Sequence, residues 1–175
     1  MKVLLISTNT LTEPYASYPI GLDYVINAIS PSHRVKAVDM NELPDGKGLT
    51  DILADYVPDV VGLSIRNIDN VEETNLKTFI GGIRELINVI RQHSKGVIVL
   101  GGSGFTIMPG ELMDFLDADF GIIGEGERFP LLLKALENNE SVAGIPGVIT
   151  RKGSVVTPDP WPGSFSRGSI PNHSY

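Results

Sequence analysis

Four short segments of the chain place glycine, hydroxyl, amide or charged residues directly after apolar runs. Ser7-Thr8-Asn9-Thr10 is uncharged, whereas Ser64-Ile65-Arg66-Asn67 adds a guanidinium that could bind an amide or a phosphate. Gly101-Gly102-Ser103-Gly104-Phe105 allows a ligand to approach the backbone, because glycine has no Cβ and accepts positive φ. Gly124-Glu125-Gly126-Glu127 places a carboxylate between two glycines. These residues suit a flat or phosphorylated ligand, although ordinary turn chemistry explains the first three segments taken alone, and the helix dipole explains Glu127. Glu125 has no such explanation, because a carboxylate between two glycines gains no advantage in forming a helix.

Signatures of catalysis are sparse. His33, His93 and His173 are scattered, and no spacing supports a metal cluster or a nucleophile–base pair. No Gly-x-Gly-x-x-Gly follows the first apolar run and no Gly-x-x-x-x-Gly-Lys-Ser/Thr occurs, which disfavours a nicotinamide cofactor and an NTPase loop. The absence of cysteine excludes disulfides, thiolate zinc sites and an iron–sulfur cluster held by this chain. We therefore identify no catalytic residue and no metal ligand, and favour ligand binding.

The apolar runs before these segments predict buried strands over residues 3–6, 60–65, 97–100 and 119–123. An alternating run over 34–39 predicts a strand nearer an edge, and helical periodicity fills the intervals. This alternation predicts an α/β fold: a three-layer, flavodoxin-like or Rossmann-like open parallel sheet with strand order 2-1-3-4-5. Ligands of such sheets bind at the carboxyl ends of the strands, where we expect the four segments to meet.

The pattern changes after residue 140. Residues 147–150 and 154–157 flank Lys152-Gly153 and predict a small β-hairpin, and no periodicity survives beyond Pro158. We therefore expect an α/β domain over residues 1–140, a hairpin extension over 141–157 and an extended linker over 158–175.

The chain is acidic, with a net charge of −7 over 175 residues. A negative surface disfavours nucleic acid as a partner. No apolar stretch approaches the roughly 18 residues of a membrane helix, and the amino terminus lacks the pattern of a signal peptide. We therefore expect no membrane partner and a cytoplasmic protein.

An ordered set of motifs resembles the amino-terminal cobalamin-binding domain of cobalamin-dependent radical S-adenosylmethionine (SAM) proteins. The set covers most of residues 1–157 and comprises Pro19-Ile20-Gly21-Leu22, Pro58-Asp59-Val60-Val61-Gly62-Leu63-Ser64, Val99-Leu100-Gly101-Gly102, Pro109, Asp119, Gly124-Glu125-Gly126-Glu127 and Ile145-Pro146-Gly147-Val148. Gly21 thereby joins the candidate cofactor-binding residues. The segment from Ser166 to Pro171, with Tyr175, resembles the lead into the family's radical domain, which carries a Cys-x-x-x-Cys-x-x-Cys motif. The resemblance implies that this domain, with its SAM and [4Fe-4S] cluster, lies outside the chain, and that the parent protein is a radical SAM enzyme.

One departure from the wider cobalamin-binding superfamily concerns the cobalt ligand. The Asp-x-His-x-x-Gly motif would fall after the first strand, where the chain reads Ser7 to Thr12 without histidine. The resemblance therefore implies cobalamin held base-off, with no histidine ligand. It also implies that the nucleotide tail enters near Ser64 and the Gly101–Gly104 loop, with the corrin over the carboxyl edge. On this hypothesis Gly102→Val abolishes cobalamin binding and leaves the domain folded.

The leading hypothesis is a module that presents cobalamin to a radical SAM domain, for methyl transfer or another radical reaction of an unidentified substrate. Two alternatives remain open on the residues alone. One is a structural or partner-docking domain of the same fold that has lost the cofactor. The other is a flavodoxin-like module that binds a flavin or a nucleotide.

Overall fold

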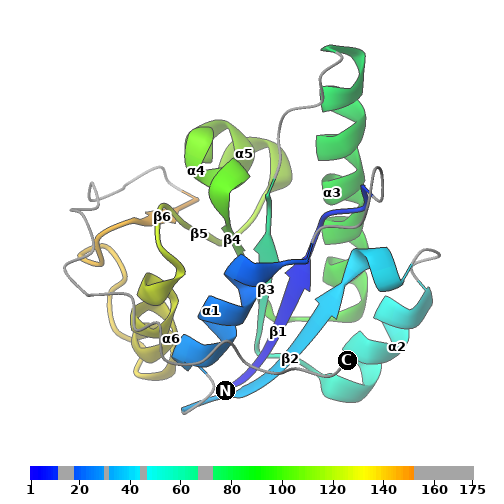
Figure 1. Ribbon diagram of the computed structural model, residues 1–175. Helices are drawn as coiled ribbons and strands as arrows, with labels where there is room; N and C mark the ends of the chain where they lie inside the picture. The colour runs from blue at the N-terminus through cyan, green and yellow to red at the C-terminus, as the bar shows by residue number, and fades with distance from the viewer. Residues whose placement is uncertain (12–17, 30–31, 44–46, 67–72, 152–175) are drawn as a thin grey trace.

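The computed structural model describes residues 1–11, 18–29, 32–43, 47–66 and 73–151, and Figure 1 shows their arrangement. The strands are β1 (Lys2–Ser7), β2 (Arg34–Asp39), β3 (Val60–Ser64), β4 (Val97–Gly101), β5 (Phe120–Ile122) and β6 (Val148–Thr150). The α-helices are α1 (Ile20–Ile29), α2 (Lys47–Tyr56), α3 (Glu73–His93), α4 (Ser103–Ile107), α5 (Pro109–Leu116) and α6 (Phe129–Glu137). Two short 3-10 helices, η1 (Met40–Glu42) and η2 (Gly126–Arg128), follow β2 and precede α6.

The strands form one sheet in the order β2-β1-β3-β4-β5-β6. The first five pair in parallel, and β6 pairs antiparallel with β5. This arrangement confirms the predicted order 2-1-3-4-5 and adds a reversed strand at one edge. β6 matches the first strand of the predicted hairpin, and the second, residues 154–157, lies outside the described residues.

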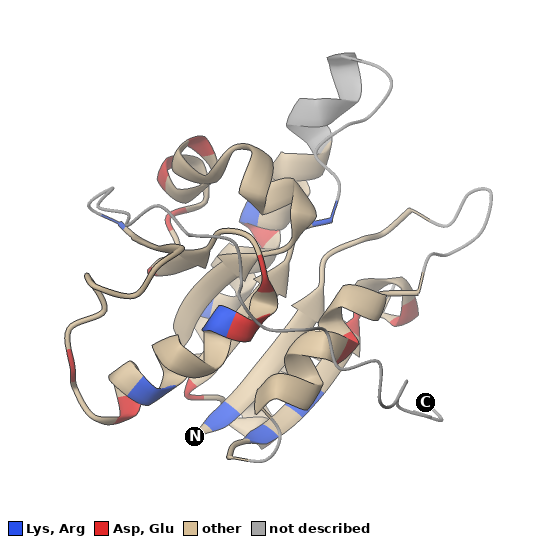
Figure 2. Ribbon diagram, turned by 60° about the vertical axis from the view of Figure 1, so that its left-hand side comes forward, with Lys and Arg blue, Asp and Glu red and all other residues tan. Residues whose placement is uncertain are grey.

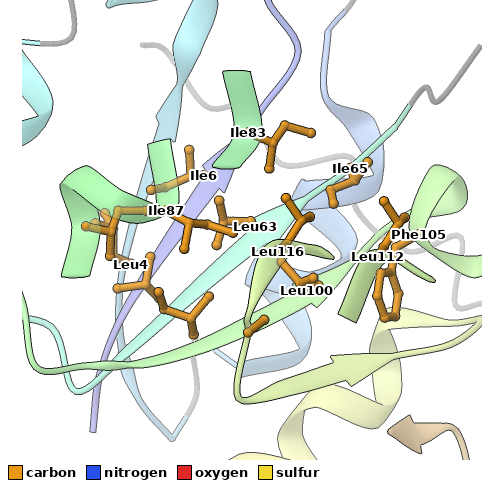
Figure 3. Close-up of a cluster of buried hydrophobic side chains, with 14 of the residues drawn as sticks. Leu4, Ile6, Leu63, Ile65, Ile83, Ile87, Leu100, Phe105, Leu112 and Leu116 are labelled. Atoms are coloured by element: carbon orange, nitrogen blue, oxygen red, sulfur yellow. The ribbon is translucent and has the colours of Figure 1, made fainter. Parts of the chain in front are cut away.

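Helices cover both faces of the sheet. Alternate residues of a strand point to opposite faces, and both sets are apolar here, so each face needs helices to bury it. Leu4 and Ile6 belong to a cluster formed with α2, α3, α4 and α5. Figure 3 shows the part of this cluster in which Ile83, Ile87 and Phe105 contact the strands. Val3, Leu5 and Val60 belong to a second cluster, formed with α1 and α6 on the other face. The sheet thus lies between two layers of helices, as Figure 1 shows, with one cluster on each of its faces.

Most charged side chains lie at the surface, and among the described residues Asp23 and Arg128 are the buried exceptions. Figure 2 shows Lys, Arg, Asp and Glu on helices, on loops and on β1 and β2, whereas β3 (VVGLS) and β4 (VIVLG) have none. Such apolar central strands are typical of a parallel sheet covered on both faces. No helix in the described ranges is long and apolar enough to span a bilayer.

The segment after β4 differs from its prediction. We expected Gly101–Phe105 to be a loop, but α4 already begins at Ser103. Gly102 turns the chain with φ of 97°, and its carbonyl then accepts a hydrogen bond from the Thr106 amide at 3.1 Å. The turn is therefore a single residue, and the glycines lead directly into a short helix.

Candidate functional site

β1, β3 and β4 end side by side at the carboxyl edge of the sheet. The strand order changes direction between β1 and β3. Ser7 pairs with Ser64, and Ser64 pairs with Gly101, so candidate residues from β1, β3 and β4 lie in one row. The chain leaves β1 through α1 and leaves β3 towards α3, and these helices lie on opposite faces. Connections that diverge in this way leave a crevice at the carboxyl ends of the strands, which is the usual ligand site of such sheets.

A cavity of about 420 Å³ occupies this crevice. Its wall includes these candidate residues from the sequence: Ser7, Asn9, Gly21, Ser64, Arg66, Gly101, Gly102, Ser103, Gly124 and Gly126. The structure therefore brings together residues from all four segments, and Gly21 from the start of α1.

The cavity combines a largely apolar lining with polar side chains at the ends of the strands. The interior residues come from strands and from the helices on the α1 face, and include Leu5, Leu22, Val25, Leu63, Val99, Leu100, Ile122 and Phe129. Serine hydroxyls and the Asn9 amide lie where the strands end. Among the described residues of the wall, Arg66 alone carries a charge. Such a site suits a largely neutral ligand with an apolar part and several polar substituents.

Gly102 and Gly124 are the turning points of the wall, and both have positive φ, 97° and 82°. A Cβ on Gly102 would lie 2.5 Å from the Ile65 carbonyl oxygen. A Cβ on Gly124 would meet nothing within 4 Å. The close packing at Gly102 is thus against the backbone that follows β3, whereas the space at Gly124 is open.

This packing changes what Gly102→Val would test. We expected the valine to abolish binding in a folded domain. Because its Cβ would overlap the Ile65 backbone at a positive φ, the structure predicts a loss of stability instead. Substitution of Gly102 therefore cannot separate binding from folding.

Several candidate residues do not line the cavity. The Thr8 hydroxyl donates to the Ser64 carbonyl at 3.0 Å, and Ile65 and Phe105 are buried in the core cluster that contains α3. A Cβ on Gly104 would lie 3.0 Å from the carbonyl oxygens of Ile65 and Arg66. These residues hold the loops together and leave the ligand space to others.

The acidic loop residues also lie outside the wall. The Glu125 carboxylate is 3.8 Å from the guanidinium of Arg128, whose Nη1 donates to the Pro146 carbonyl at 3.1 Å. This ion pair gives the carboxylate between two glycines a structural partner. Neither Glu127 nor Thr10 lines the cavity, and Asn67 lies outside the described residues.

Sequence reasoning missed most of the wall that α1 provides. Tyr18, Pro19 and Ile20 line the cavity, although only Gly21 of this stretch was predicted. Apolar lining residues have the same periodicity as core residues, so the sequence pattern cannot separate them. Gly62 also lines the cavity and could have been predicted, because a glycine inside a strand often marks a place where a ligand or another backbone approaches closely.

The described histidines lie away from the cavity. His33 precedes β2, with its Nδ1 3.5 Å from Glu137, and His93 ends α3, at the amino edge of the sheet. No group of three His, Cys, Asp or Glu that could hold a metal ion occurs within the part of the chain that the structure describes.

Comparison with known proteins identifies the domain. The family model described as a B12 binding domain matches residues 6–133. The tryptophan 2-C-methyltransferase of Streptomyces laurentii is 30% identical over an alignment that covers 97% of this chain and 28% of that protein. The chain therefore spans less than a third of the length of this curated relative.

Two solved proteins share the fold. The radical SAM methyltransferase TsrM from Kitasatospora setae, solved with tryptophan and a SAM analogue, superposes with a TM-score of 0.80 at 31% identity, over 90% of this chain and 30% of that one. The cobalamin-dependent radical SAM enzyme OxsB gives a TM-score of 0.66 at 17% identity, over 89% of this chain and 22% of that one, and supports the fold alone. These findings confirm the resemblance seen in the motifs. Because the family model covers most of the sequence, the chain belongs to the B12-binding domain family.

Proposed function

We propose that the cavity binds cobalamin and that the chain is a cofactor-holding domain. The observation that carries the proposal is the row of Ser7, Ser64 and Gly101 at the cavity in a domain of the B12-binding family. A TsrM structure that is 30% identical to this chain contains cobalamin and a [4Fe-4S] cluster.

The residues of the cavity fit parts of this cofactor. The apolar interior, which includes Leu5, Val99 and Phe129, suits the aromatic base of the nucleotide tail. The hydroxyls of Ser7 and Ser64 can bind propionamides or the tail, and Arg66 can bind an amide carbonyl or the phosphate. The open space at Gly124 and Gly21 admits a group that any side chain there would displace.

We further propose that cobalamin is held base-off and without a histidine ligand. In support, His33 and His93 do not line the cavity, and the described part of the β1 loop contains no histidine. An apolar interior offers the displaced base a place away from cobalt. His173 lies outside the described residues and is therefore included in the test.

The role of this chain in the reaction is to bind and orient. When bound, cobalamin supplies cobalt-centred chemistry such as methyl transfer. The serines and glycines at the strand ends fix the position of the cofactor, and the apolar residues beneath them exclude water from its buried part.

For the whole protein we propose methyl transfer by a radical SAM domain that holds SAM and a [4Fe-4S] cluster outside this chain. The support comes from the names of the relatives, a tryptophan 2-C-methyltransferase and a radical SAM methyltransferase. The division into residues 1–140, 141–157 and 158–175 stays a prediction.

The test is a titration of the purified chain with hydroxocobalamin, followed by desalting and a visible spectrum. We expect retained corrin with the spectrum of a base-off form. A folded but colourless protein would favour a docking domain that has lost the cofactor. Retention of a flavin in a parallel titration would favour a flavodoxin-like module.

The histidine question needs a separate variant. Replacing His33, His93 and His173 together with alanine should leave the bound spectrum unaltered. A shifted spectrum would contradict the proposal that no histidine ligates cobalt, while leaving cobalamin binding itself intact.

A further inference from the structure

Side-chain hydroxyls connect the loops that surround the cavity. Thr8 donates to the Ser64 carbonyl at 3.0 Å and so joins the loop that follows β1 to the end of β3. Ser103 donates to the Arg66 carbonyl at 2.9 Å and joins the segments that follow β3 and β4. The Thr106 hydroxyl joins the segments that follow β4 and β5, because it bonds to both Gly102 and Gly124. Each pair of neighbouring loops is thus connected by one hydroxyl.

The Thr106 hydroxyl both donates and accepts. Its Oγ1 donates to the Gly102 carbonyl at 3.1 Å and accepts from the Gly124 amide at 3.0 Å. The first bond is common for a threonine in a helix, whose hydroxyl often binds the carbonyl four residues earlier. The second bond is not explained by the helix, because Gly124 belongs to another strand's loop.

The two partners of this hydroxyl are the turning glycines of the cavity wall. Gly102 and Gly124 both line the cavity, with φ of 97° and 82°. Their strands no longer pair at this level, since the last pair between β4 and β5 joins Leu100 and Gly121. The Thr106 hydroxyl therefore continues the hydrogen-bonded connection beyond the end of the ladder.

We infer that Thr106 is a positioning residue that fixes Gly102 and Gly124 relative to each other and so shapes the cofactor cavity before binding. Thr106 does not itself line the cavity, so its effect must pass through the two glycines. A wall that is already ordered loses less conformational freedom when the ligand binds. The inference rests on the proposed cobalamin site.

Three variants isolate this role. Thr106→Val keeps the branched shape and removes the hydroxyl, whereas Thr106→Ser keeps the hydroxyl. Ser94→Ala is the matched control, because the Ser94 hydroxyl accepts from the Gly96 amide at 3.0 Å at the opposite edge of the sheet. Hydroxocobalamin affinity is measured by visible titration, and exchange of the Gly124 amide by NMR.

We expect Thr106→Val to weaken hydroxocobalamin binding by about tenfold, because binding must then order a wall that the hydroxyl no longer holds, and to speed exchange at Gly124. Thr106→Ser should restore both values to within about twofold, and Ser94→Ala should leave the affinity unchanged.

Unchanged affinity of Thr106→Val, in a chain that binds the cofactor, overturns the inference. If the unsubstituted chain does not bind hydroxocobalamin, the proposed function fails, and exchange at Gly124 then decides alone. Faster exchange in Thr106→Val, reversed in Thr106→Ser, would still support the positioning role, and unchanged exchange would overturn it.

Discussion

The two walls of the cavity are built differently. On the sheet side, backbone hydrogen bonds join the loops directly: the Ile65 amide donates to the Gly101 carbonyl at 2.8 Å, and the Gly104 amide donates to the Ile65 carbonyl at 2.9 Å. On the α1 side, the wall consists of side chains, and Tyr18 and Ile20 are 48% and 55% exposed.

One buried polar contact joins Tyr18 to α1 in this wall. Asp23 is only 3% exposed, and one of its carboxyl oxygens accepts a hydrogen bond from the Tyr18 hydroxyl. Its other oxygen, Oδ1, is buried and has no hydrogen-bond partner among the residues that the structure describes. Backbone hydrogen bonds thus fix the sheet wall, and side chains fix the α1 wall. Substitutions in the sheet wall should change stability, whereas a larger side chain at an open position of the α1 wall, such as Gly21, should change the space for a ligand.

The largest effect is expected at Gly102. Gly102→Val should lower the free energy of unfolding by about 3 kcal/mol or more, because its Cβ meets the Ile65 backbone at a strained φ. Urea denaturation measures this change. Gly110→Ala in α5, where a Cβ meets nothing within 4 Å, is the control and should not be destabilised. A Gly102→Val protein as stable as the original would mean that the sheet wall is not fixed by backbone.

At Gly21 the effect should fall on the ligand instead. A Cβ here meets nothing within 4 Å, so Gly21→Leu can extend into the mouth of the cavity. We expect hydroxocobalamin affinity to fall by about tenfold or more, without loss of stability, because leucine is a better helix former than glycine.

Gly82→Leu in α3 is the matched control for this substitution. Gly82 is also an exposed helical glycine with open space at its Cβ, but it does not line the cavity. The affinity of the Gly82→Leu variant for hydroxocobalamin should therefore equal that of the original chain. If both variants lost affinity equally, occupation of the cavity could not be the cause.

Tyr18→Phe probes the contact that holds the α1 wall. Removing the hydroxyl takes away the hydrogen bond to the buried Asp23 carboxyl, and we expect a loss of about 1–2 kcal/mol in the free energy of unfolding. Asp23→Asn retains an oxygen that can accept from Tyr18, so its loss should be smaller. Equal stability of Tyr18→Phe and the original chain would show that the contact does not anchor this wall.

The smallest effect lies at the amino edge, far from both walls. The amino-terminal ammonium of Met1 donates to Glu137 at 3.0 Å, and this hydrogen bond lowers the pKa of Glu137 below its ordinary value, with His33 adding attraction. Because the pKa is lowered in the folded state, the stabilisation is complete above the unfolded pKa. It is lost as the pH falls through the folded value.

Glu137→Gln should therefore flatten the dependence of stability on pH below about pH 5 and have little effect at neutral pH, since the pair is exposed. Urea denaturation across this pH range checks the slope, and added salt should reduce the difference. An altered affinity for hydroxocobalamin in this variant would contradict the separation of the two edges.

The sequence predicted the sheet wall better than the α1 wall. Glycines and serines after apolar runs located Ser7, Ser64 and Gly101, because strand ends are readable from pattern and the topology then brings them together. Tyr18 and Ile20 were missed because a lining side chain and a core side chain look alike in sequence. Residue type also could not tell that the hydroxyls of Thr8 and Ser103 face backbone carbonyls.

The open space at Gly21 has a consequence for redesign of the domain. Random substitution over Ile20 and Gly21 should yield mostly folded proteins with altered ligand preference, because neither position is enclosed by other atoms. The same mutagenesis over Gly102 and Gly104 should yield mostly unfolded proteins, because a Cβ at either position meets backbone at 3.0 Å or less. A search for new ligand specificity in this scaffold should therefore begin on the helix and leave the strand ends as they are.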